Sequence, residues 1–138
     1  MRYTTREGSL GATVDTWVNL ATVGSETAPS AVEVPPGVSR IRQLLFSVGD
    51  EAVTAAQIGT NIILKLSGGL IGVPEQEFVV DGYSVIWLTA GAGGAPGRMY
   101  KREVDLPVKP GEKMLIDGCA CGGVCAGSPS LGITIGWE

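Results

Sequence analysis

The chain has 138 residues, of which 21 are glycine and 8 are proline, and its ten cations and fourteen anions give a net charge of −4. Glycine and proline at this level exclude a long helix or a coiled coil, because both residues interrupt helices. A hydrophobic content of 44% with only 17% charged residues excludes intrinsic disorder and is typical of a single compact domain.

Short runs rich in Val, Ile, Leu and Thr recur along the chain between Gly and Pro residues, which is the pattern of an all-β protein. Residues 16–23 (TWVNLATV) alternate as a strand does, and residues 31–34 form a second strand that ends at a turn, residues 35–37 (PPG). Residues 40–48 (RIRQLLFSV) give the clearest strand. Their apolar run at residues 44–46 predicts burial on both faces of a sheet.

The middle of the chain contains the only predicted helix, of one or two turns, at residues 50–58 (DEAVTAAQI). Residues 61–67 (NIILKLS), 77–80 and 83–89 (YSVIWLT) predict strands. The pair Asp81-Gly82 separates the last two and predicts a hairpin turn between them.

The C-terminal part predicts three more strands, at residues 102–108, 113–117 and 131–137 (LGITIGW), with a turn at residues 109–112 (KPGE) between the first two. The total is about eight strands, and their unequal loops favour an antiparallel β-sandwich of the jelly-roll type over an up-and-down barrel. An immunoglobulin-like sandwich stays open as an alternative, although its Cys–Trp–Cys spacing is missing.

The sequence contains no histidine, which excludes Ser-His-Asp and Cys-His catalysis and removes the commonest transition-metal ligand. Catalysis by lysine or carboxylates is left open in principle. The carboxylate pairs Glu75 with Glu77 and Glu103 with Asp105 lie two residues apart, where a strand presents both side chains on one solvated face rather than across a cleft. We therefore expect a protein that is not an enzyme, with no catalytic residues and no cofactor.

A glycine-rich segment, residues 91–97 (GAGGAPG), invites comparison with phosphate-binding loops. Pro96 stands where the G-x-G-x-x-G pattern needs its last glycine, and no Lys-Ser/Thr pair follows. We expect a surface loop here and no nucleotide site.

Three cysteines, Cys119, Cys121 and Cys125, lie within seven residues. They could supply three thiolates to a metal, but a structural zinc site uses four ligands and no histidine is available to complete it. The odd count and the absence of a secretion signal argue against a disulfide framework. We predict three free thiols, acting as small buried apolar side chains, with no bound metal.

The charge pattern also bears on partners. The densest group of cations, Arg98, Lys101 and Arg102, is followed at once by two acidic residues, so no basic patch suited to a phosphate backbone forms. No apolar stretch approaches the roughly 20 residues that span a bilayer. We expect no direct contact with nucleic acid and none with a membrane.

The first 30 residues give weaker strand signals than the rest, and residues 24–30 separate residues 16–23 from the later strands. We therefore divide the chain into an N-terminal arm, residues 1–30, and a β-sandwich domain, residues 31–138, and expect the arm to pack on a neighbouring subunit. Aromatic residues near both ends are difficult for a monomer to cover. The candidate subunit contacts are Tyr3, Trp17, Leu20 and Trp137.

The chain resembles, over most of residues 16–137, the virion structural proteins of jelly-roll or β-sandwich type. The resemblance is one of overall pattern, carried by the turns at residues 34–37 (VPPG) and 108–112 (VKPGE) and by the closing strand at residues 131–135 (LGITI). Many capsid proteins have a basic N-terminal arm, whereas here the first 39 residues contain only two cations. This difference indicates an outer-shell or decoration role rather than genome packaging.

The resemblance implies a non-enzymatic structural protein of a virus particle, a capsid shell or decoration protein, that forms a homo-oligomer and contacts other virion proteins. It also implies a location in the virion, with assembly in the host cytoplasm. The alternative is a carbohydrate- or protein-binding β-sandwich module, which exposed aromatic residues on one sheet would favour. Trp87 lies within an apolar strand and is interpreted as a core residue.

Overall fold

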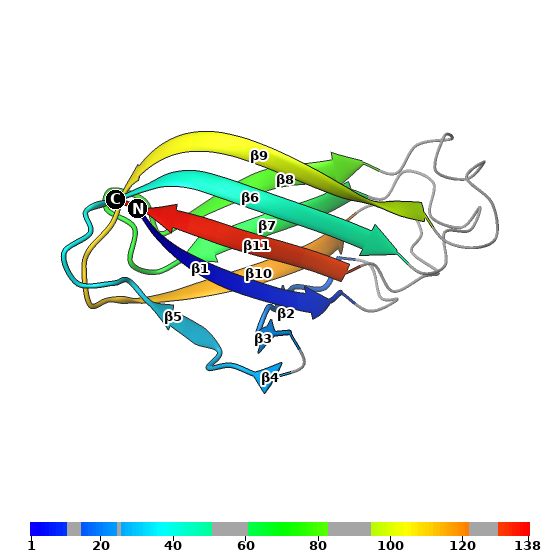
Figure 1. Ribbon diagram of the computed structural model, residues 1–138, viewed down its shortest axis with the longest axis horizontal. Helices are drawn as coiled ribbons and strands as arrows, with labels where there is room; N and C mark the ends of the chain where they lie inside the picture. The colour runs from blue at the N-terminus through cyan, green and yellow to red at the C-terminus, as the bar shows by residue number, and fades with distance from the viewer. Residues whose placement is uncertain (11–14, 25, 51–60, 83–94, 122–129) are drawn as a thin grey trace.

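A computed structural model describes residues 1–10, 15–24, 26–50, 61–82, 95–121 and 130–138 (Figure 1). These residues form eleven strands and no helix, which confirms the all-β prediction. The strands are β1 (Arg2–Ser9), β2 (Val18–Asn19), β3 (Thr22–Val23), β4 (Glu26–Thr27), β5 (Ala31–Glu33), β6 (Arg40–Asp50), β7 (Asn61–Ser67), β8 (Glu75–Gly82), β9 (Ala95–Pro107), β10 (Lys113–Cys121) and β11 (Ser130–Trp137).

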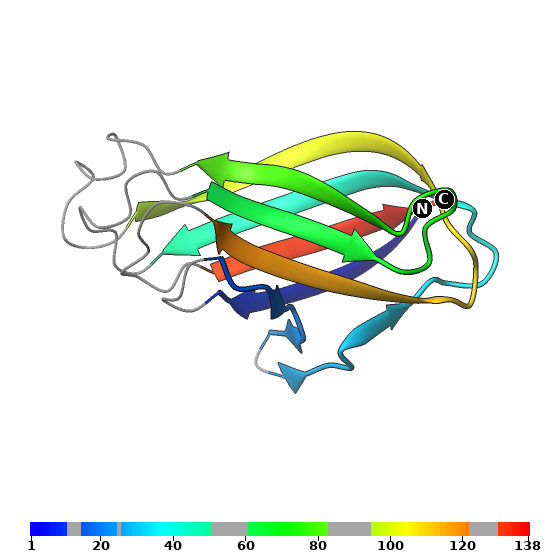
Figure 2. The ribbon, with the colours of Figure 1, turned by 180° about the vertical axis from the view of Figure 1, so that it is seen from behind.

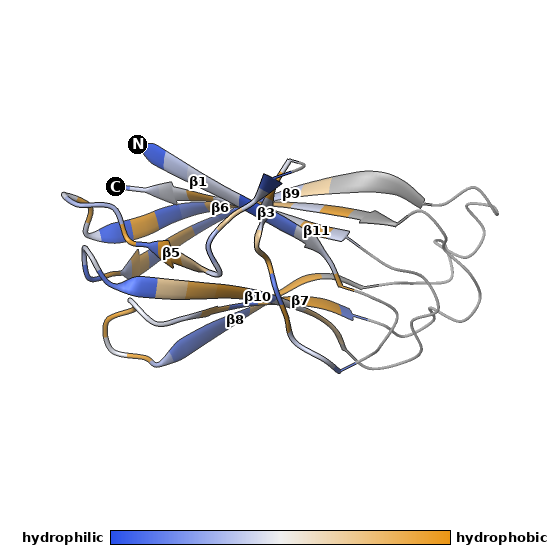
Figure 3. Ribbon diagram, turned by 90° about the horizontal axis from the view of Figure 1, so that it is seen from below, coloured by the Kyte–Doolittle hydropathy of each residue, from blue (hydrophilic) through white to orange (hydrophobic). Residues whose placement is uncertain are grey.

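The strands make two sheets that pack face to face, as the view along their edges shows (Figure 3). The six-stranded sheet has the order β4-β3-β1-β11-β6-β9, and the five-stranded sheet has the order β2-β10-β7-β8, with β5 also paired to β10. The antiparallel pairs are nested: β1 with β11, β5 with β10, β6 with β9 and β7 with β8. In a jelly roll the first strand pairs with the last, and the strands between them pair in the same nested order. The pairing here therefore agrees with the jelly roll that the sequence predicts.

Alternation along the strands explains how the sheets acquire their core. In β7 every second side chain, Ile62, Leu64 and Leu66, is fully buried, while the intervening residues face outward. The six-stranded sheet supplies Phe46, whose ring lies 6.4 Å from that of Phe78 across the interior. These side chains belong to one continuous hydrophobic core.

Two predicted turns lie where the sequence placed them. Gly37 and Gly111, which end the PPG and KPG segments, have φ angles of 81° and 82°. Such angles are strained for residues with a Cβ, and glycine adopts them freely. The hairpin turn predicted at Asp81-Gly82 is wrong, because both residues belong to β8 and pair with β7. Of the predicted helix at residues 50–58, Asp50 is instead the last residue of β6, and the other residues lie outside the described part of the chain, as does the predicted strand at residues 83–89.

The division into an arm and a sandwich differs from the arrangement in the structure. β1 pairs with β11 over its full length, in the middle of the six-stranded sheet, so that the N- and C-terminal strands lie side by side (Figures 1 and 2). Leu10 and Leu20 are 2% and 1% exposed and belong to the core. The described part of residues 1–30 therefore completes the sandwich of its own chain, because β1 pairs with β11 and β2 pairs with β10.

The predicted strand at residues 16–23 is divided into two short strands. β2 pairs with β10 in the five-stranded sheet, whereas β3 pairs with β1 in the six-stranded sheet. Between them, the Leu20 amide donates to the Ile116 carbonyl at 2.9 Å, and the Leu20 side chain fills the space between the sheets. The segment thus crosses from one sheet to the other.

The prediction of three free thiols is wrong for Cys119, which is disulfide-bonded and fully buried. The prediction was based on the odd number of cysteines. An odd number excludes pairing of all three cysteines, but it still permits one disulfide bond. The partner sulfur lies outside the side chains that the structure describes.

Within the described residues there is no helix that is long and apolar enough to cross a bilayer. The described residues also contain no group of three or more potential metal ligands.

Candidate subunit-contact surface

The outer face of the six-stranded sheet, called here the flat face, is built by the outward side chains of β1, β11, β6 and β9. The inward positions of these strands, such as Ile133, Ile135 and Phe46, are in the core, so their neighbours point outward. The register aligns the outward residues in three rows: Tyr3–Gly136–Gln43–Glu103, Thr5–Thr134–Leu45–Lys101 and Glu7–Gly132–Ser47–Met99.

The two middle strands of the flat face carry no charged side chain in these rows. β11 presents Gly132, Thr134 and Gly136, because its sequence alternates small residues with buried apolar ones. The Thr134 hydroxyl is 2.9 Å from that of Thr5, so the polar groups of the middle row are partly satisfied within the face. The result is a neutral stripe of small side chains along the centre of the sheet.

The glycines of β11 leave this stripe without protruding side chains. A Cβ at Gly132 would overlap the Ser47 hydroxyl, and a Cβ at Gly136 would lie 3.1 Å from that of Gln43. The neighbouring side chains instead lie over β11. Shallow hollows of about 210 and 110 Å³ flank Gly132, the first reaching Thr22 and the second Leu45.

Exposed apolar side chains surround the stripe. Met99 is 81% exposed and lines the smaller hollow, while Tyr3 is 57% exposed in the row at the other end. Leu45, in the centre, is half-buried, so the predicted burial of residues 44–46 on both faces is fulfilled on the inner face only. A neutral centre of small side chains, bordered by exposed apolar groups, is typical of contact surfaces.

The outer face of the five-stranded sheet is different in character. Lys65 lies 3.9 Å from Glu75 and 4.2 Å from the centre of the Trp17 ring, and Lys113 lies 3.4 Å from Glu33. Removing charged pairs of this kind from water carries a desolvation penalty. Val79 and Leu115 are also exposed on this face, at 58% and 42%, but its charged pairs make it the poorer candidate for a contact.

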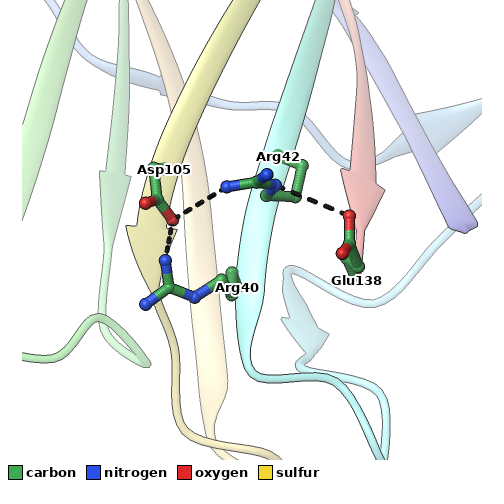
Figure 4. Close-up of polar contacts among 4 residues, drawn as sticks. All are labelled: Arg40, Arg42, Asp105 and Glu138. Atoms are coloured by element: carbon green, nitrogen blue, oxygen red, sulfur yellow. Dashed lines mark hydrogen bonds and ion pairs between the residues drawn. The ribbon is translucent and has the colours of Figure 1, made fainter.

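A cluster of four charged residues closes the end of the flat face (Figure 4). Asp105 on β9 accepts from Arg40 and lies 3.4 Å from Arg42, which in turn lies 3.5 Å from Glu138. A register shift between Ile41 and Gln43 marks a bulge. All four side chains are about half exposed, and their charges balance, so the cluster ties strands together rather than presenting a net charge to a ligand.

A hollow of about 500 Å³ adjoins this cluster. Its lining includes Arg42, Gln43, Glu103, Asp105 and Glu138, which combine one cation with three carboxylates. Arg42 is paired with two of these carboxylates, and Glu103 lies 3.8 Å from Lys101. The hollow is therefore a polar depression at the border of the flat face, and its carboxylates have cationic neighbours.

The four residues predicted as subunit contacts do not share one surface. Tyr3 lies on the flat face, whereas Trp17 is half-buried beside Lys65 on the opposite sheet. Leu20 and Trp137 are 1% and 0% exposed, because the fold of the same chain covers them. The sequence did contain a signal for the flat face: in LGITIGW the outward positions are Gly, Thr and Gly.

Comparisons with known proteins give structural likenesses only. No known protein family matches the sequence, and no curated protein matches it either. The globular domain of zebrafish complement 1qA has a TM-score of 0.47 and 11% identity over 96% of this chain and 91% of that one. A structure of infectious bursal disease virus, strain Gx, has a TM-score of 0.41 and 13% identity, and the match covers 96% of this chain and 32% of that chain. Turnip yellow mosaic virus gives 0.29 and 11%, with 97% and 78% of the chains covered. With TM-scores below 0.5 and identities of 11–13%, these similarities, two of them to viruses, carry no argument about this chain.

Proposed function

We propose that this chain is a non-enzymatic structural protein of a virus particle, a shell or decoration protein that assembles through contacts between subunits. The observation that carries the proposal is the flat face: a neutral stripe on β11 and β6, bordered by exposed Tyr3 and Met99, on a jelly-roll sandwich. A monomer gains nothing from leaving such a face to water, whereas an assembly buries it.

Two features support a role other than catalysis. The chain has no histidine for acid–base chemistry at neutral pH. The carboxylates that stand two apart on β9 are engaged with cations, Glu103 with Lys101 and Asp105 with Arg40. These pairs are those expected of a solvated strand surface rather than of a reactive cleft.

The alternative of a carbohydrate-binding module needs a platform of exposed aromatic rings. Among the described aromatic residues only Tyr3 is strongly exposed, and Trp137 is fully buried. The described part of the chain therefore gives the alternative no specific support, and we retain the structural role.

The charge of the chain supports a place in the virion away from the genome. The net charge is −4, and the arginines Arg40 and Arg42 are both held in ion pairs with carboxylates. Affinity for a phosphate backbone depends on clustered free cations. An outer-shell or decoration position, reached after assembly in the host cytoplasm, suits this surface.

Size-exclusion chromatography with light scattering tests the proposal on the chain at micromolar concentration. We expect a defined multiple of the 14.2 kDa chain mass that persists on dilution towards the micromolar range. A chain that is monomeric throughout the micromolar range would contradict a role that depends on self-assembly.

A further inference from the structure

We infer that the flat face binds the same face of a second copy of this chain, in a contact with two-fold symmetry. The inference rests on the proposed function, and it names the surface and the partner through which assembly takes place. Three properties of the flat face indicate that its partner is a second copy of the chain. They are its uncharged centre, its pattern of protruding and recessed side chains, and the arrangement of its charges across the strands.

The neutral centre makes contact with an identical surface feasible. Two copies of a face with charges in the middle would oppose like charges, which is unfavourable. In the flat face the central positions are occupied by Thr134, Gly132, Leu45 and Ser47, and the charged residues of the rows lie only on the outer strands β1 and β9. A second copy can therefore cover the centre without burying an unpaired charge.

The flat face carries both a protruding side chain and hollows that could receive it. A two-fold contact requires that every protrusion and the depression that receives it lie on the same surface. Met99 protrudes, with 81% of its surface exposed, and the hollows beside Gly132 lie in the same row of the same face. Methionine is flexible enough to fit such a shallow depression.

The charge order across the strands sets the direction of the contact. The strands run β1-β11-β6-β9, with Glu7 on β1 at one side and, on β9 at the other, Lys101 and Glu103, which lie 3.8 Å apart. A two-fold axis along the strands, between β11 and β6, places β9 of one copy over β1 of the other. Lys101 then faces the row of Thr5 in the second copy and is adjacent to its Glu7, and the symmetry repeats this opposite-charge contact.

The size of the face is adequate. Four strands about 4.8 Å apart and eight residues long cover about 500 Å² in projection. Specific interfaces bury about 800 Å² of accessible surface on each partner, and accessible surface exceeds its projection because side chains protrude.

Charge reversal tests the arrangement, because Glu7 and Lys101 are separated by two intervening strands within one chain and can meet only between copies. We expect Glu7→Lys and Lys101→Glu each to weaken dimer formation by about tenfold, since each disturbs two symmetry-related contacts. The double variant should restore the dissociation constant to within about threefold of the original, as a direct pair does. Analytical ultracentrifugation over a concentration series measures all four proteins.

Two further variants distinguish a contact at the flat face from an effect of changed net charge or of lost monomer stability. Glu77→Lys reverses an exposed charge on the outer face of the five-stranded sheet and should leave the dissociation constant unchanged. Met99→Lys puts a charge on a highly exposed side chain of the flat face and should weaken dimer formation while leaving the thermal unfolding of the monomer intact.

The outcomes distinguish the two proposals. An assembly that withstands both single reversals and Met99→Lys would overturn the flat face as the contact and leave the proposed function standing through another surface. If both single charge reversals weaken assembly but the double variant does not restore it, the two-fold pairing of Glu7 with Lys101 is overturned. A chain that is monomeric before any substitution would contradict the proposed function itself.

Discussion

The indole Nε1 of Trp137 donates a hydrogen bond to the hydroxyl oxygen of Thr4, at 2.9 Å. Trp137 ends β11 and is fully buried, while Thr4 lies in the neighbouring strand β1. The ring thus fills the core, and its one polar group is satisfied by the strand that covers it, which is what a buried tryptophan requires.

We expect Thr4→Val to lower the free energy of unfolding by about 1–3 kcal/mol, because it leaves a buried indole N–H without its acceptor. Urea unfolding followed by tryptophan fluorescence measures the change. Thr5→Val is the matched control, since Thr5 is exposed and its hydroxyl partner, the half-buried Thr134, lies on the outer face of the sheet. Equal losses for the two variants would contradict a special role for the Trp137 hydrogen bond.

Arg102 joins the two sheets at one edge of the sandwich. Its guanidinium lies 5.9 Å from the ring centres of both Phe46 and Phe78, and it donates to the Val79 carbonyl at 3.1 Å. We expect Arg102→Ala to lower the free energy of unfolding by about 1 kcal/mol through loss of the cation–π contacts and the hydrogen bond. Lys109→Ala removes an exposed cation from the turn after β9 and should change the free energy of unfolding by less than about 0.5 kcal/mol. Thermal denaturation compares the two variants, and equal effects would refute the edge contact.

The charged cluster at the end of the flat face should give a salt-dependent contribution. Asp105→Asn removes the carboxylate shared by Arg40 and Arg42, and we expect a loss of about 0.5–1 kcal/mol at low ionic strength because the pairs are half exposed. The loss should shrink in about 1 M NaCl, where the screening length is only about 3 Å. Urea denaturation at low ionic strength and in about 1 M NaCl measures the loss, with Glu77→Gln as the control. A loss that is the same at both salt concentrations would argue against an electrostatic origin.

The disulfide at Cys119 predicts a definite thiol count. Alkylation of the unfolded, unreduced chain should modify one of its three cysteines, and alkylation after reduction should modify all three. Because all three cysteines lie within seven residues, the bond closes a short loop, and Cys119→Ala should lower the free energy of unfolding by about 2 kcal/mol or more once cavity formation is included. Three reactive thiols before reduction, counted by mass spectrometry, would be evidence against the bond.

Local patterns predicted the strands well where alternation and turn chemistry agree. Residues 40–48 and 61–67 fall within β6 and β7, and the glycines of the two Pro-Gly turns have the positive φ angles that such turns need. These features depend on neighbouring residues only, so the sequence contains what is needed to find them.

Pairing between distant segments could not be found in the same way. Trp137 was expected to lie uncovered, but β1 covers it, and that strand is separated from it by almost the whole chain. The split of residues 16–23 between two sheets likewise depends on where β1 and β10 lie. The flat face was missed for the same reason, since its rows join four strands whose register no local pattern specifies.

The central place of β11 has a consequence for the order of folding. β11 lies between β1 and β6, so until it has been synthesised the six-stranded sheet exists only as two unconnected parts with exposed edges. Its pairing with β1 closes a loop of nearly the full chain, and contacts so distant in sequence form slowly. Nascent chains of this protein should therefore depend on chaperones or on rapid completion, because until β11 arrives they present apolar strands that other copies can join.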